Sequence, residues 1–197
     1  MRKILSLLAM LLACTAMFAQ ATEQHVKFMG IPLNGTITQF QSKLLAKGCT
    51  YDAETSKAIS TDCRVFNGVF ASKKVSIYVY YDNNTKIVYR AKAVNDGMAE
   101  SIADQEYGRI KELLTTKYES DGITGSQSDK ESCCWGIFSK PKGDDTDEGG
   151  GLIGEVDLYI VKDEKTYIRY PYNYSLHIDY IDFLNKEKHT EKDLEDL

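Results

Sequence analysis

Histidine is scarce in this sequence, which contains only His25, His177 and His189. No second pair of cysteine or histidine residues stands at the spacing of zinc ligands, so we expect no metal site and no cofactor. Nucleophilic catalysis needs a nucleophile, a base and an orienting group that converge. Only His177 has a candidate partner, Asp179, at a position that an extended strand would place on the same face. The sequence therefore contains one weak candidate for a catalytic pair.

Dense clusters of lysine and arginine are also absent. Acidic residues outnumber basic ones by 29 to 24, which gives a net charge of −5. A protein that binds the phosphate backbone needs a basic stripe, so nucleic acid is not an expected partner. After residue 21 there is no run of 18 consecutive apolar residues, and we expect no membrane span in that part of the chain.

The first 21 residues have the pattern of a bacterial secretory signal. Arg2 and Lys3 form a positive start, an apolar run extends from Ile4 to Phe18, and Ala19-Gln20-Ala21 is a small-x-small cleavage site. The run is shorter than the roughly 20 residues that a membrane-spanning helix needs. We therefore expect an exported protein, periplasmic or secreted, that is cleaved after Ala21.

Lipidation is the alternative outcome of this signal. Leu11-Leu12-Ala13-Cys14 resembles a bacterial lipobox, in which Cys14 would carry a lipid anchor. Cleavage after Ala21 would leave 176 residues. The removed segment holds two of the basic residues and none of the acidic ones, so the remainder would have a net charge of −7.

Apolar spacing predicts an α+β fold. A 3.6-residue period indicates helices after Thr36, with Ile37, Phe40, Leu44 and Leu45 inward, and over about residues 98–118. Between residues 49 and 94 the period changes to two, and we expect about four antiparallel strands in a meander. Alternation returns after Gly122 and includes 156–160, 166–172 and a last strand around Leu176–Tyr180. The charged segment 185–197 is expected to be a solvated tail.

The order of elements predicts an antiparallel sheet with two helices packed on one face. The region 22–184 divides into halves of about 30–95 and 96–184, which look like two copies of a helix-plus-four-strand unit. This arrangement resembles the duplicated units of the β-lactamase-inhibitor-protein-like and PepSY-like exported bacterial domains. The turn Gly30–Gly35 that leads into a helix also resembles uncharacterised exported proteins of gut bacteria. The resemblance implies a binder or an inhibitor.

Four cysteines follow the signal, and two of them flank an expected hairpin centred near Ser56. Cys49 and Cys63 would face each other if the hairpin forms, and an oxidising compartment permits a disulfide. Closing a loop of this length would contribute about 3 kcal/mol in the chain-entropy model. Two buried free thiols are the alternative. Cys133 and Cys134 are adjacent on an expected strand, so one should be in the core and the other outside.

Tyrosine is the notable enrichment, with 13 residues that all follow the signal. Several alternate with the aliphatic positions of the strands. Because tyrosine and arginine dominate binding hot spots, a sheet face without helices is a candidate binding surface. Tyrosine also simply suits half-buried strands. The candidate binding residues are Tyr78, Tyr80, Arg90, Lys92, Tyr159 and Arg169.

The sequence favours a non-catalytic exported binding module that recognises a protein or glycan partner. It would use this sheet face or the polar loop 140–151. The acidic stretch 144–148 in that loop lacks the EF-hand spacing, so we expect a solvated loop and not a calcium site. Two alternatives are an envelope hydrolase that uses His177 and Asp179, and a structural envelope protein without a discrete ligand.

Overall fold

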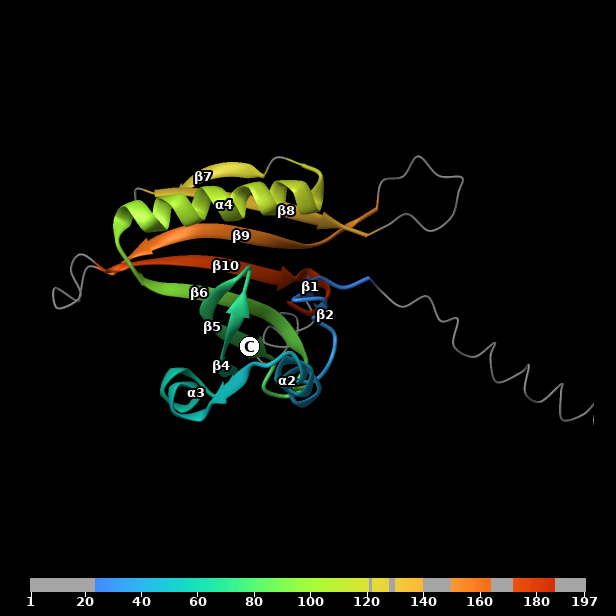
Figure 1. Ribbon diagram of the computed structural model, residues 1–197. Helices are drawn as coiled ribbons and strands as arrows, with labels where there is room; N and C mark the ends of the chain where they lie inside the picture. Colours follow the sequence, from blue (N-terminus) through green and yellow to red (C-terminus); the bar gives the residue numbers. More distant parts are fainter. Residues whose placement is uncertain (1–23, 121, 128–129, 140–149, 164–171, 187–197) are drawn as a thin grey trace, which may run out of the picture.

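The computed structural model describes residues 24–120, 122–127, 130–139, 150–163 and 172–186. The predicted signal, the loop 144–148, Arg169, all but the last residue of the predicted strand 166–172 and most of the charged tail lie outside these ranges. Within them the α+β class is confirmed (Figure 1). No described helix is both long and apolar enough to cross a membrane.

Each half of the described chain is a helix followed by four sheet strands. The first half contains α2 (Ile37–Ala46), β3 (Thr50–Asp52), β4 (Cys63–Phe70), β5 (Lys73–Tyr81) and β6 (Val88–Met98), with a short helix α3 (Ala53–Ile59) between β3 and β4. The second half contains α4 (Glu100–Tyr118), β7 (Ile123–Gln127), β8 (Lys130–Phe138), β9 (Leu152–Lys162) and β10 (Tyr174–Asp182).

The two halves share one eight-stranded sheet with the order β3-β4-β5-β6-β10-β9-β8-β7. Every strand pair in it is antiparallel, and within each half the strands form a meander. The last strand of one half, β6, pairs with the last strand of the other, β10. The first strands, β3 and β7, are therefore the two edges.

The α2 helix has clear start and stop signals. Thr36 accepts a hydrogen bond from the Gln39 amide, and the Gln39 side chain accepts one from the Thr36 amide, which together form a capping box. Gly48, with φ of 84°, follows the C-cap in the left-handed region that glycine adopts without strain. Ile37, Phe40 and Leu44 are buried, whereas the predicted inward residue Leu45 is exposed.

Both long helices pack on the same face of the sheet. Paired residues in a sheet point to the same side, and one row runs Arg64, Val79, Ala91, Tyr180, Val156 and Trp135 across β4 to β8. Arg64 donates a hydrogen bond to Gln41 of α2. Further along the row, the Lys117 ammonium of α4 lies over the Tyr180 ring of β10. This confirms the predicted arrangement of helices on one face (Figure 1).

A small N-terminal hairpin packs against the sheet beside β10. Its strands are β1 (Lys27–Phe28) and β2 (Ile31–Pro32), and Phe28 stacks on Phe70 and meets Tyr180 edge to face. Asp182 is fully buried, accepts a hydrogen bond from the Val26 amide and pairs with His25. The first and last described segments are thus held together by one carboxylate.

Of the two alternatives for Cys49 and Cys63, the structure has two buried free thiols and not the disulfide. The segment between them forms α3 and not a simple hairpin turn, and both thiols are free. A Cβ on Gly68 would lie 2.7 Å from Cys49 Sγ, which places this thiol on the helix-covered side with Val75, the partner of Gly68. Cys63 pairs with Tyr80 on the opposite side. Because the two sulfur atoms lie on different faces, the sheet separates them.

Candidate binding face

The sheet face that points away from α2 and α4 carries most of the half-buried polar side chains of the strands. We call it the polar face. One row across it runs Tyr78 (β5), Lys92 (β6), Asp179 (β10), Asp157 (β9) and Cys134 (β8). The neighbouring positions in phase with this row are Tyr80, Arg90, Glu155, Tyr159, Ser175 and His177.

Arg90 and Asp179 form the centre of the polar face. The Arg90 Nε atom lies 2.9 Å from Asp179 Oδ1, and Arg90 Nη2 also binds Asp179 Oδ2. The Asp179 side chain is only 2% exposed, whereas the Arg90 side chain is 33% exposed. The hydrogen bond to Asp179 raises the pKa of Arg90 above its ordinary value. This charge-assisted pair fixes the guanidinium in one orientation.

Two tyrosines lie beside the basic residues. The Arg90 guanidinium carbon is 4.9 Å from the centroid of the Tyr80 ring, and the Lys92 ammonium is 5.4 Å from that of Tyr78. These are cation–π distances. Burial lowers the pKa of Lys92 and raises the pKa of Tyr80 to about 12. At neutral pH the Tyr80 hydroxyl is therefore a protonated hydrogen-bond donor next to fixed positive charge.

His177 stacks on Tyr159, with ring centroids 5.0 Å apart. Its Nε2 lies 2.8 Å from Ser175 Oγ, while the buried Nδ1 has no hydrogen-bond partner among the described residues. Burial, followed by the charges of Lys92 and Arg90, lowers the pKa of His177 to about 4. The imidazole is thus neutral at pH 7 and a weak base.

The geometry does not assemble a catalytic triad around His177. His177 and Asp179 do share a face, as predicted, but Asp179 is bound by Arg90 and does not accept a hydrogen bond from His177 Nδ1. A base that is not oriented by a carboxylate, and whose pKa is low, is poorly suited to activate the Ser175 hydroxyl.

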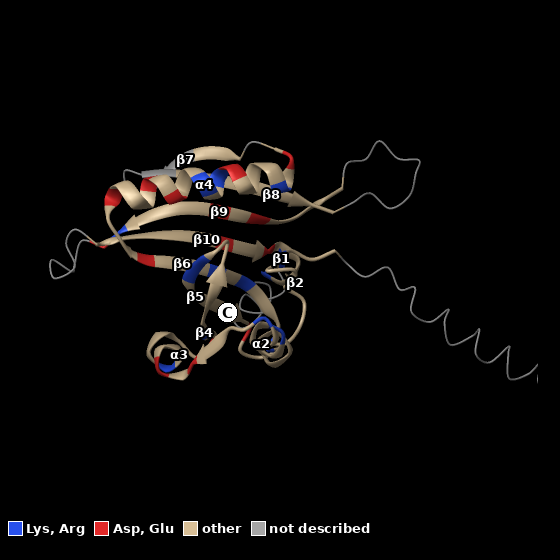
Figure 2. Cartoon of the chain, viewed as in Figure 1, with Lys and Arg blue, Asp and Glu red and all other residues tan. Residues whose placement is uncertain are grey.

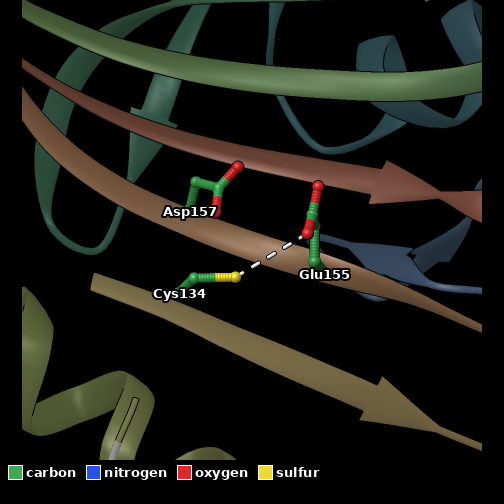
Figure 3. Close-up of side chains that lie close together, drawn as sticks. All are labelled: Cys134, Glu155 and Asp157. Carbon is green, nitrogen blue, oxygen red and sulfur yellow. Dashed lines mark hydrogen bonds between the residues drawn. The ribbon is translucent and has the colours of Figure 1, made fainter. Parts of the chain in front are cut away.

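A thiol and two carboxylates lie together on β8 and β9, beside the Arg90–Asp179 pair. Cys134 Sγ is 3.7 Å from Glu155 Oε2, and ligand atoms of Cys134, Glu155 and Asp157 all lie within 4.8 Å of one another (Figure 3). Burial and the nearby Asp157 raise the pKa of Glu155, and burial also raises that of Asp157. Burial and the same carboxylates raise the pKa of Cys134 to about 12, so the thiol keeps its proton.

The structure places five of the six predicted binding residues on the polar face: Tyr78, Tyr80, Arg90, Lys92 and Tyr159. The sixth, Arg169, is outside the described residues. Sequence reasoning missed Glu155 and Asp157. The sequence did contain a pattern that could have placed them on this face, because Glu155, Asp157 and Tyr159 alternate with buried residues on one strand. Their position next to Cys134, in contrast, depends on the register of β8 with β9.

The charges on this face are divided between the two halves of the chain. The basic residues Arg90 and Lys92 stand on β6, which also carries Asp96, and the other acidic residues of this face stand on β9 and β10 (Figure 2). A ligand that lies across the face would therefore meet Arg90 and Lys92 on β6 and the carboxylates of Glu155 and Asp157 on β9.

A separate groove of about 670 Å³ lies between the N-terminal segment, the end of α4 and the β8–β9 strands. Val26, Tyr118, Ile137, Phe138 and Ile153 line it with apolar surface. It contains none of the clustered polar groups of the polar face.

Comparison of the chain with protein-family profiles, with curated proteins and with solved structures finds no match.

Proposed function

We propose that this chain is a non-catalytic binding module, and that its polar face recognises a protein partner. The observation that supports this most strongly is the convergence of Tyr78, Tyr80, Tyr159, Arg90 and Lys92 on one sheet face. Tyrosine and arginine are the residue types that contribute most to binding at protein interfaces. Export, predicted from residues 1–21, is part of this proposal and would place the partner in the envelope or outside the cell.

Preorganisation is the second argument for recognition. Arg90 is held by Asp179 and packs on Tyr80, and Tyr159 is stacked on His177. Side chains that are already ordered lose little conformational entropy when a partner binds. The half-buried aromatic rings also offer apolar area, and their protonated hydroxyls can donate hydrogen bonds.

The test compares two double variants that remove the same number of tyrosines. Tyr78→Ala/Tyr80→Ala removes rings from the polar face. Tyr51→Ala/Tyr172→Ala removes two tyrosines that are 41% and 58% exposed outside that set, and it serves as the matched control. The partner is captured from envelope extract with the wild-type protein, identified by mass spectrometry, and its dissociation constant is then measured with each purified variant.

We expect Tyr78→Ala/Tyr80→Ala to weaken binding by at least about 30-fold, since one hot-spot residue contributes about 2 kcal/mol or more. The control variant should bind like the wild type, and thermal melts should show that both variants are folded. Equal affinity of the two double variants would contradict the proposal. Capture of a glycan in place of a protein would contradict its choice of partner.

A further inference from the structure

The Cys134, Glu155 and Asp157 side chains converge because of the strand register. Cys134 and Asp157 are direct partners across β8 and β9, and Glu155 is two residues before Asp157 on the same side of β9. Figure 3 shows the Cys134 sulfur pointing towards the two carboxylates. All three side chains are half-buried, which distinguishes them from acidic groups spread over a solvated surface.

The spacing of these atoms matches the first coordination shell of zinc. Zinc binds thiolate sulfur at about 2.3 Å and carboxylate oxygen at about 2.1 Å, so a tetrahedral ion holds such a pair about 3.6 Å apart. In the structure the Cys134 thiol donates a hydrogen bond to Glu155 Oε2 over 3.7 Å, so the sulfur and the oxygen already lie at about the separation that a zinc ion would require. The other separations between the ligand atoms of Cys134, Glu155 and Asp157 lie within 4.8 Å.

The local charge provides an independent argument for a divalent cation. Among the described residues, Arg90 pairs with Asp179, but no lysine or arginine forms an ion pair with Glu155 or Asp157. The Lys186 ammonium also acts electrostatically on both carboxylates and lowers their pKa values. With the Glu155, Asp157 and Asp179 carboxylates ionised, the group that includes Arg90 has two excess negative charges. Loss of the Cys134 proton on metal binding raises this to three, so one divalent cation would reduce the net charge to −1.

We propose that Cys134, Glu155 and Asp157 form a three-ligand binding site for zinc. On binding, the Cys134 S–H bond breaks, the proton goes to solvent, and a Zn–S bond forms without any change in oxidation state. Three protein ligands leave a fourth tetrahedral position for a water molecule. Calcium and magnesium are disfavoured because they require six or more oxygen ligands and do not use sulfur. This site does not depend on the proposed protein partner.

The test uses the purified, untagged protein after treatment with a chelator. Zinc is titrated by isothermal calorimetry, and Co²⁺ is used as an absorbing substitute whose bond to a thiolate produces a near-ultraviolet charge-transfer band. We expect one ion to bind per chain and the band to appear. Cys134→Ser should abolish the band and weaken zinc binding by more than about tenfold. Asp157→Asn should weaken zinc binding similarly while the thiolate band persists at saturating Co²⁺.

Cys63→Ser is the matched control. Cys63 is a second thiol on the same face of the sheet, but it belongs to β4, which lies near the opposite edge of the sheet from β8. This variant should bind both ions like the wild type. The melting temperature of each variant without metal shows whether it is folded, and Asp157→Asn provides a second test if Cys134→Ser is not. The proposal is overturned if the wild type does not bind zinc, if Cys134→Ser retains the band, or if Cys63→Ser loses it.

Discussion

Replacement of Arg90 by methionine tests the pair at the centre of the polar face. Methionine keeps much of the length of the side chain but leaves Asp179, which is 2% exposed, without its guanidinium partner. Removing one partner of a buried ion pair typically costs about 3 to 5 kcal/mol, because a buried charge is left uncompensated. Arg90 is itself 33% exposed, and water can therefore replace part of the interaction, so we expect a loss of about 2 to 4 kcal/mol.

This loss should lower the melting temperature by roughly 4 to 16 °C, since a domain of this size shifts by about 2 to 4 °C per kcal/mol. Urea unfolding gives the free energy directly. The double variant Arg90→Met/Asp179→Asn replaces the orphaned carboxylate by a neutral amide and should recover at least half of the loss. Arg64→Met is the control, because Arg64 donates to the neutral Gln41 side chain, and it should cost less than about 1 kcal/mol. A loss below about 0.5 kcal/mol for Arg90→Met, or no recovery in the double variant, would refute the argument.

Two further predictions concern stability. The pKa of His177 is about 4 in the fold against 6.5 as its ordinary value, so between these pH values the unfolded chain takes up a proton that the folded chain does not. The free energy of unfolding should therefore fall as the pH falls through this window. His177→Gln should reduce the loss of unfolding free energy between pH 7 and pH 5 by about 2 kcal/mol. If the variant loses as much unfolding free energy as the wild type over this range, the argument is contradicted. A Cβ added at Gly154 would overlap the backbone oxygen of Ile181, whereas one at Gly151 would meet nothing within 4 Å. In chemical denaturation we expect Gly154→Ala to cost about 2 kcal/mol or more and Gly151→Ala to be near neutral, and equal effects would show that the backbone yields at Gly154.

The fold class could be predicted because the spacing of apolar residues changes period clearly. Ile37, Phe40 and Leu44 indicate a helix, and Val75, Ile77 and Val79 indicate a half-buried strand, and the structure has both. The short helix α3 was missed because its seven residues are too few to show a periodicity, and because it is fixed by tertiary contacts. One of them is the hydrogen bond from the Val65 amide to the buried Ser56 hydroxyl.

For the site, the sequence predicted which residues of one strand share a face, but not which residues of different strands lie next to each other. Alternation placed Tyr78 and Tyr80 on one face, but no local pattern states which residue of a distant strand lies opposite. The pairing of Arg90 with Asp179 and that of Cys134 with Asp157 follow from the registers of β6 with β10 and of β8 with β9. The same limit left the disulfide open, since the proximity of Cys49 and Cys63 in the sequence gave no information about which side of the sheet each thiol faces.

The central junction of β6 with β10 has a consequence for the order of folding. Each meander needs only its own neighbouring strands, so hairpins can form locally while the rest of the chain is still being made. The junction, in contrast, joins segments almost ninety positions apart, as in the Arg90–Asp179 contact. Asp182 likewise bonds Val26 from 156 positions further along the chain. The edge of β6 that faces the second half therefore stays unpaired until β10, the last strand of the sheet to be synthesised, pairs with it.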